Sequence, residues 1–242
     1  MEYATELGLD EGLTAVIGAG GKKSTMYAVA PTLDRAVVTT AVRIPPFEDQ
    51  VAEFYETSDP LSALESAEAW PIGLSPAYEE KRYLGYDFDT LAAIADSPIL
   101  QAVFVKADGA RNRELKVPGE DEPKVPPAAD RVLGLASAQV VGKPLSEEYV
   151  HRVQRVSDLT GIEPGEELTV EAVATILSSP DGAEQGVPDS AEFIPVLNKV
   201  DDAAIQETAR EIADRVLERG RADRVALTQL RGREEPLVEL RS

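Results

Sequence analysis

The chain of 242 residues contains no cysteine, a single histidine and a single tryptophan, and its eight lysines are outnumbered by sixteen arginines. The absence of cysteine excludes disulfides, thiolate metal sites and nucleophilic cysteine chemistry. No apolar run approaches the ~20 residues that a membrane span needs, and the first residues are neither basic nor apolar enough for a signal peptide. We therefore expect a cytoplasmic protein with no membrane partner.

Positive charge is also scarce, because 44 acidic residues against 24 basic ones give a formal net charge of −20. Such a surface repels nucleic-acid phosphates, so we expect no nucleic-acid partner. A dense carboxylate surface with few lysines is typical of adaptation to high salt, where charge screening shortens to roughly 3 Å at 1 M. An ordinary acidic protein is the alternative.

Short apolar runs alternate with helix-compatible segments along the chain. Strands are predicted over residues 13–17, 36–40, 102–107, 131–135, 193–197 and, last, 224–227. Helices are predicted over residues 24–33, 51–55, 88–95, 147–159, 170–177 and 202–219. This alternation predicts an α/β fold, a doubly wound and mostly parallel sheet flanked by helices in a P-loop NTPase-like three-layer sandwich. We expect one domain over residues 1–242, with an inserted subdomain or loop region around residues 44–100.

A glycine-rich turn follows the first predicted strand, at Gly18-Ala19-Gly20-Gly21-Lys22-Lys23-Ser24-Thr25. In a phosphate loop, glycines let backbone N–H groups point at the phosphates, and a lysine reaches the β- and γ-phosphates. The spacing departs from G-x-x-x-x-G-K-[ST], because Val16 stands at the first glycine position and Lys23 directly follows Lys22. The Mg²⁺ hydroxyl then falls to Ser24 or Thr25. A Rossmann-type dinucleotide turn and a plain glycine-rich turn stay open as alternatives.

Two later strands end in residues that a nucleotide site needs. Asp108-Gly109 follows the third strand, at the edge where α/β sheets collect ligands and an acidic residue commonly holds Mg²⁺. Asn198-Lys199-Val200-Asp201 follows the fifth and matches N-K-x-D, in which a carboxylate accepts hydrogen bonds from guanine. A turn-forming Asp-Gly pair and a helix cap at Asp201 are the structural alternatives. The joint order of the three motifs favours nucleotide binding.

With these motifs in order, the sequence resembles the YqeC family of selenium cofactor biosynthesis or selenium-dependent hydroxylase accessory proteins. The resemblance covers most of the chain and rests on Gly18-Ala19-Gly20-Gly21-Lys22, Thr39-Thr40, Asp108-Gly109-Ala110-Arg111, Leu115-Lys116-Val117-Pro118, Glu122-Pro123, Val125-Pro126, Gly142-Lys143-Pro144-Leu145-Ser146, Val150-His151-Arg152 and Leu197-Asn198-Lys199. It implies an NTP-dependent factor that serves the maturation of a molybdenum-dependent hydroxylase carrying labile selenium, or the insertion of its cofactor. A hydroxylase subunit is therefore an expected partner.

We expect Mg²⁺-dependent binding and hydrolysis of a nucleotide, GTP rather than ATP. The predicted catalytic residues are Lys22, Asp108 and Arg111, and the predicted metal ligands are Ser24 and Asp108. The predicted nucleotide-binding residues are Gly18, Ala19, Gly20, Gly21, Lys22, Lys23, Ser24, Thr25, Thr39, Thr40, Asn198, Lys199 and Asp201.

The long loop over residues 108–130 carries the basic residues Arg111, Arg113 and Lys116. They are predicted to neutralise phosphate charge or to hold a small anionic second substrate, with a solvated loop as the alternative. His151, the lone histidine on a predicted helix, is expected to be structural or on the surface, with general acid–base catalysis as the alternative. Two other functions stay open: a kinase or nucleotidyl transferase acting on a small anionic acceptor, and a non-catalytic, nucleotide-gated chaperone.

Overall fold

The computed structural model describes residues 2–232 and 235–242 of the chain. Within these ranges the fold is built on a nine-stranded sheet, in which every neighbouring pair is parallel except the one at the β13 edge. The strands lie in the order β13 (Leu237–Arg241), β12 (Val225–Thr228), β11 (Glu192–Asn198), β9 (Arg131–Ser137), β1 (Gly12–Gly18), β7 (Ala102–Lys106), β2 (Ala36–Thr40), β4 (Ile72–Ser75) and β3 (Glu53–Glu56).

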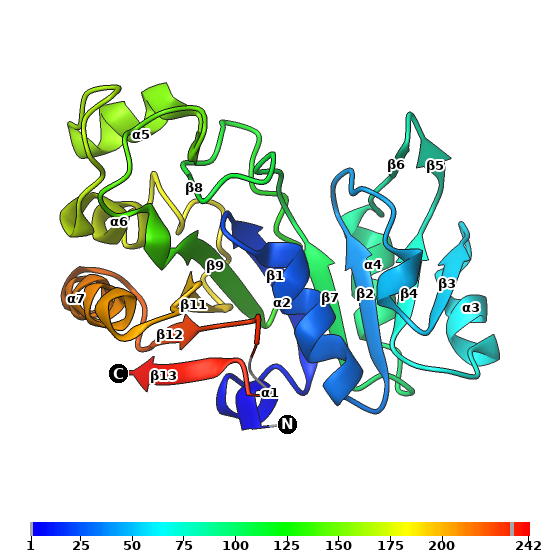
Figure 1. Cartoon of the computed structure of the whole chain (residues 1–242). Helices are drawn as coiled ribbons and strands as arrows, with labels where there is room; N and C mark the ends of the chain where they lie inside the picture. The colour runs from blue at the N-terminus through cyan, green and yellow to red at the C-terminus, as the bar shows by residue number, and fades with distance from the viewer. Residues whose placement is uncertain (1, 233–234) are drawn as a thin grey trace.

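Helices cover both faces of the sheet (Figure 1). One face carries α1 (Glu2–Glu6) and α2 (Lys22–Val29), and the other carries α3 (Pro60–Ser66), α4 (Phe88–Ala95), α5 (Val153–Thr160), α6 (Val170–Leu177) and α7 (Ala203–Arg219). Short 3₁₀ turns lie at η1 (Ala30–Thr32), η2 (Glu48–Gln50) and η3 (Ala138–Val140). The predicted doubly wound, three-layer α/β fold is confirmed, and it is consistent with a P-loop NTPase-like fold.

The apolar runs in the sequence correspond to strands that are buried on both faces. In β1, Leu13, Ala15 and Ile17 belong to the core under α3 to α7, whereas Val16 belongs to the core under α1 and α2. Successive side chains of a strand point to opposite faces, so a strand covered on both sides reads as a continuous apolar run. Because β1 lies between β7 and β9, the carboxyl ends of these three strands meet at one edge of the sheet.

Two short strand pairs lie outside the main sheet. The hairpin of β5 (Tyr78–Glu79) and β6 (Arg82–Tyr83) is antiparallel, and the pair of β8 (Leu115–Lys116) and β10 (Val150–His151) is parallel. Residues 44–100 contribute this hairpin, α3 and α4, and they also extend the main sheet with β3 and β4. No helix in the described ranges is long and apolar enough to cross a membrane.

Three local predictions differ from the structure. The helix predicted over residues 51–55 is wrong, because residues 53–56 pair with β4 as the edge strand β3. The helix predicted over residues 147–159 begins only at Val153, since Val150 and His151 pair with β8 and Arg152 adopts a left-handed φ of 67°. The strand β12 is not the last one, because the antiparallel β13 follows it.

Replacing Gly18 by alanine tests how tightly the end of β1 is packed. Gly18 has a φ of 89°, and an added Cβ would collide with the carbonyl oxygen of Leu135 in β9. We expect Gly18→Ala to lower the free energy of unfolding by about 2 kcal/mol or more, because strain and a backbone clash act together. Gly109→Ala is the matched control, since no atom lies within 4 Å of its added Cβ. Equal denaturation midpoints for the two variants would contradict this packing.

Candidate functional site

The glycine-rich turn joins the end of β1 to the start of α2. Gly18, Gly20 and Gly21 all have positive φ, at 89°, 77° and 141°, so this turn follows a path that few other residues adopt. Helix α2 starts with Gly21 as N-cap, with no side-chain cap and no acidic residue in its first turn. The first N–H groups of a helix have no partner inside it, so this end of α2 has donors and partial positive charge to offer a ligand.

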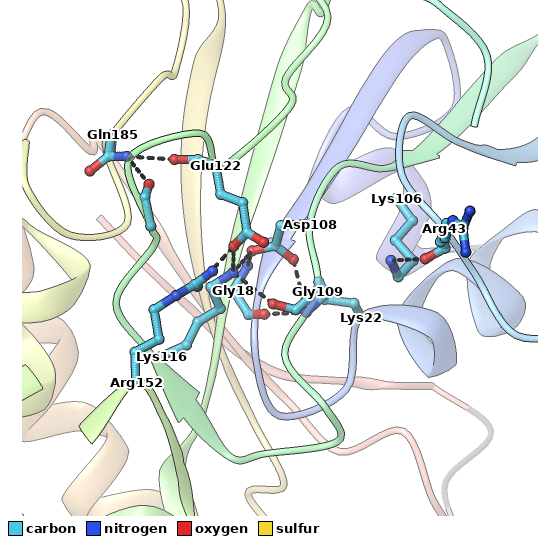
Figure 2. Close-up of polar contacts among 11 residues, drawn as sticks. Gly18, Lys22, Arg43, Lys106, Asp108, Gly109, Lys116, Glu122, Arg152 and Gln185 are labelled. Carbon is cyan, nitrogen blue, oxygen red and sulfur yellow. Dashed lines mark hydrogen bonds and ion pairs between the residues drawn. The ribbon is translucent and has the colours of Figure 1, made fainter. Parts of the chain in front are cut away.

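Asp108 joins this turn to the end of β7. Its Oδ2 accepts a hydrogen bond from the Gly18 N–H at 2.8 Å and lies 2.8 Å from Lys116 Nζ. Its Oδ1 lies 3.0 Å from Lys22 Nζ but makes no hydrogen bond, and Lys22 donates to the Gly18 carbonyl oxygen (Figure 2). Burial alone raises the pKa of Asp108, but the ammonium groups of Lys22 and Lys116 outweigh it and lower the pKa below its ordinary value. The carboxylate is therefore ionised and surrounded by donors.

The same ion pairs continue away from the turn. Lys116 Nζ lies 2.7 Å from Glu122 Oε2, and the same oxygen lies 2.9 Å from Arg152 Nη1. Together these residues form an ion-pair chain, Arg152–Glu122–Lys116–Asp108–Lys22, in which positive and negative groups alternate (Figure 2). The pairing of β8 with β10 places Lys116 beside His151, next to Arg152. The chain is nearly closed to solvent at Asp108 and Lys116, whose side chains are each 1% exposed.

A cavity of about 690 Å³ opens beside the turn, lined by residues 19–24, residues 109–114 and parts of five other segments. We call it the loop cavity. Nine lysine and arginine residues line it against two glutamates, in a chain whose net charge is −20. In the described part of the chain, six of these nine have no carboxylate partner: Lys23, Arg82, Lys106, Arg111, Arg113 and Arg231. This concentration of unpaired cations suits a ligand with several negative charges.

The crowding of these cations shows in the pKa of Lys106. Burial and the charge of Lys22, which outweighs the opposite effect of Asp108, lower its pKa to about 7. Lys106 Nζ donates a hydrogen bond to the carbonyl oxygen of Arg43 at 3.1 Å. Burial and the charge of Arg82 likewise lower the pKa of Lys23. An anion in the loop cavity would stabilise the charged form of these amines.

Backbone strain gathers around the same region. The described ranges contain six non-glycine residues with positive φ, namely Glu80, Lys81, Arg111, Asn112, Arg152 and Lys199. Of these, Lys81 alone lines neither the loop cavity nor a second cavity of about 450 Å³ on the far side of residues 109–111. Strained conformations cost about 1–3 kcal/mol each and cluster where a ligand is bound. Their placement marks both cavities as functional candidates.

Several predicted site residues meet at the loop cavity: Ala19, Gly20, Gly21, Lys22, Lys23, Ser24, Arg111 and Lys199. Asn198 lies behind the turn, where its Nδ2 donates to the Gly20 carbonyl oxygen at 2.8 Å and its Oδ1 accepts from Thr228 at 3.1 Å. Asp201 is exposed outside the lining and accepts a hydrogen bond from Gln139 at 2.6 Å. Asn198 thus holds the turn in place, and recognition of a base by Asn198 and Asp201 stays a prediction.

The predicted threonines are all buried and bound to backbone. Thr25 donates to the Gly21 carbonyl oxygen at 3.3 Å, Thr39 to that of Leu74 at 2.9 Å, and Thr40 to that of Lys106 at 2.9 Å. None of the three is in the lining of the loop cavity. Ser24, in contrast, is exposed and lines it, so Ser24 is the hydroxyl of the turn that a ligand reaches.

Sequence reasoning missed several residues of the site. Lys106 ends an apolar strand two positions before Asp108, a signal that sequence analysis offers. Arg43, Arg82 and Arg231 come from segments far apart in the sequence, and only the fold brings them to the loop cavity. His151, expected to be structural or on the surface, is half-buried in β10 and lines the second cavity.

Comparison with known proteins supports the family resemblance. Residues 14–154 match the family model described as YqeC protein, which spans more than half of the chain. The chain belongs to the YqeC family. A relative from Escherichia coli (strain K12), named "Uncharacterized protein YqeC", is 26% identical over 200 residues, covering 76% of this chain and 75% of its own. The matched range of this chain includes the turn, Asp108, Lys116, Glu122 and Arg152.

The acid stability of the protein tests the ion-pair chain. Burial raises the pKa of Glu122, but hydrogen bonds from Arg152 and Lys116 lower it to about 2. A carboxyl group with a lowered pKa stabilises the fold above its unfolded pKa, 4.5 here, and that contribution is lost as the pH falls toward 2. Between about pH 5 and pH 2, we expect the melting temperature of the wild-type protein to fall further than that of Glu122→Gln. The exposed Glu120→Gln is the control, and parallel losses in all three proteins would contradict the pairing.

Proposed function

We propose that the protein binds a nucleoside triphosphate with its phosphates in the loop cavity. The observation that carries the proposal is the set of six unpaired cations beside the uncapped N-terminus of α2, in a chain with a large excess of acid. Helix N-termini and basic side chains are the groups that proteins use to hold phosphates. The triphosphate of a nucleotide is a compact ligand with enough charge to match them.

The proposed role of Lys22 follows from its partners. Its ammonium group pairs with Asp108 and the Gly18 carbonyl oxygen, both of which lie at the base of the turn. A terminal phosphate offers a stronger partner, so Lys22 would turn from Asp108 to the phosphate and stabilise the charge that develops there during transfer. Arg111, exposed and unpaired in the described residues, would supply further positive charge from the opposite wall.

Two side chains, those of Asp108 and Ser24, are suited to hold one magnesium ion. Asp108 Oδ1 is buried without a hydrogen bond, and it loses its nearest cation once Lys22 turns to the phosphate. The Ser24 hydroxyl lines the loop cavity, and Asp108 lies just outside its lining, paired with Lys22, which is part of that lining. We propose that Ser24 and Asp108 hold Mg²⁺ together with phosphate oxygens and water, as Mg²⁺ sites with few protein ligands do. When bound, the ion supplies charge neutralisation at the phosphates.

The biological role is proposed from family membership. The YqeC resemblance supports a factor that uses the nucleotide in maturing a selenium- or molybdenum-dependent hydroxylase or in inserting its cofactor. Product analysis separates hydrolysis from transfer: phosphate released without an acceptor indicates an NTPase, and turnover that needs a small anionic acceptor indicates a kinase or nucleotidyl transferase. Nucleotide binding without turnover, together with co-purification of a hydroxylase subunit, indicates a nucleotide-gated chaperone.

Titration calorimetry with GTP and ATP in about 1 M KCl, with and without Mg²⁺, tests nucleotide binding. We expect Lys22→Ala to weaken binding by about tenfold or more, because a charge-assisted hydrogen bond contributes about 1.5–3 kcal/mol. Lys124→Ala is the matched control, since Lys124 is exposed and its side chain has no partner in the described residues. A folded wild-type protein that binds neither nucleotide would overturn the proposal.

The choice of base rests on Asp201, two residues beyond Lys199 of the loop cavity. We expect Asp201→Asn to weaken GTP binding by about tenfold and to leave ATP binding unchanged, because guanine alone donates two hydrogen bonds to a carboxylate here. Asp202→Asn is the control, since Asp202 caps α7 and asparagine caps a helix equally well. Equal losses for both nucleotides would assign Asp201 to structure alone.

A further inference from the structure

The second cavity lies directly behind the wall of the loop cavity. It has a volume of about 450 Å³ and is lined by Gly109, Arg111, Glu122, Glu147, His151 and Arg152. Gly109 and Arg111 line both cavities, so the two are separated only by the segment that follows β7. A ligand in either cavity therefore lies against the same short stretch of chain.

Of the two glutamates in the lining of the second cavity, Glu122 is already paired with Lys116 and Arg152, and Glu147 is exposed, so the basic residues are left to hold a small anion. Arg111 has no carboxylate partner in the described residues, and Arg152 shares Glu122 with Lys116. Burial and the charges of Arg152, Lys116 and Arg111 lower the pKa of His151 to about 4, so at neutral pH its imidazole offers a hydrogen bond without a charge. Two guanidinium groups and a neutral imidazole form a set that binds oxyanions through paired hydrogen bonds.

The ion-pair chain begins in this cavity and ends at the glycine-rich turn. Arg152 and Glu122 line the second cavity, Lys116 and Asp108 are buried between the two, and Lys22 lines the loop cavity. Lys116 serves two carboxylates, at 2.8 Å from Asp108 and 2.7 Å from Glu122. When one carboxylate binds Lys116 more strongly, the contact of Lys116 with the other carboxylate weakens, because solvent compensates buried charges poorly.

We propose that the second cavity binds a small oxyanion between Arg111 and Arg152, and that the ion-pair chain makes this binding antagonise phosphate binding in the loop cavity. An oxyanion draws Arg152 from Glu122, Glu122 then holds Lys116 more tightly, and Asp108 keeps Lys22. A phosphate in the loop cavity draws Lys22 from Asp108. Asp108 then holds Lys116 more tightly, and Glu122 keeps Arg152 as its main partner. The two effects are reciprocal, because a single coupling free energy links the two sites. The coupling rests on the proposed function, whereas the second site does not.

Inorganic phosphate serves as the probe for the second site. Calorimetry follows phosphate binding to protein already saturated with a non-hydrolysable GTP analogue, so that the loop cavity is filled. We expect a single binding event that weakens about tenfold or more in Arg152→Gln. Arg155→Gln is the matched control, because Arg155 lies one turn along α5 and pairs on the surface with Glu120. Phosphate binding that is the same in Arg152→Gln and wild type would overturn the site.

A titration of the nucleotide-free protein tests the second site independently of the proposed function. If the analogue does not bind, the proposed function fails, and phosphate is titrated into the free protein instead. Loss of binding in Arg152→Gln but not in Lys22→Ala then supports the second site. Loss in Lys22→Ala but not in Arg152→Gln places the phosphate in the loop cavity and overturns it.

The coupling is tested with Glu122→Gln, which keeps Arg111 and Arg152 but breaks the ion-pair chain. Phosphate raises the Kd of the analogue in both proteins by direct competition in the loop cavity. We expect a rise that is several-fold larger in wild type, because there the second cavity also acts through the chain. An equal rise in both proteins, with the second site intact in both, would overturn the antagonism.

Discussion

The carboxylate of Asp108 is the contact on which the site depends. It holds the Gly18 N–H at the end of β1 and pairs with Lys116 of β8 and Lys22 of α2, so one side chain fixes three elements. At 1% exposure an unpaired carboxylate would be costly to bury, and these donors make its ionised form stable. The arrangement needs β1 and β7 to be neighbours, because only then does the end of one strand lie against the end of the other.

Charge is distributed unevenly because the surface and the interior meet different conditions. The chain has 44 acidic residues, and those on the surface repel one another, a repulsion that molar salt screens within roughly 3 Å. The buried ion-pair chain is shielded from salt, so its energies persist in such a solvent. In the loop cavity, six of the nine cations have no carboxylate partner among the described residues, although the chain is rich in carboxylates. A ligand of high charge density can therefore bind there even where salt weakens exposed contacts.

Much of the fold could be predicted from local pattern, whereas the cavities could not. The β1–turn–α2 unit, Asp108 at a strand end and the helix capped by Asp202 follow from apolar runs, glycines and caps that lie close together in sequence. The β8–β10 pair joins residues 115–116 to residues 150–151, and two-residue strands carry no periodicity to detect. The predicted helix through His151 was wrong for this reason. Without that pair, the sequence gives no indication that Arg152 reaches Glu122 or that a second cavity exists.

The effect of the Lys22-Lys23 pair depends on the groups around Lys23. In a standard phosphate loop the residue after the lysine is a hydroxyl that binds Mg²⁺, and here Lys23 occupies that position. Lys23 lines the loop cavity, has no carboxylate partner in the described ranges and has a lowered pKa because it is half-buried near Arg82. An ammonium group there adds attraction for phosphate in the ground state as well as in the transition state. In the proposed nucleotide site such a turn would favour tight binding over fast hydrolysis, since only differential stabilisation accelerates a reaction.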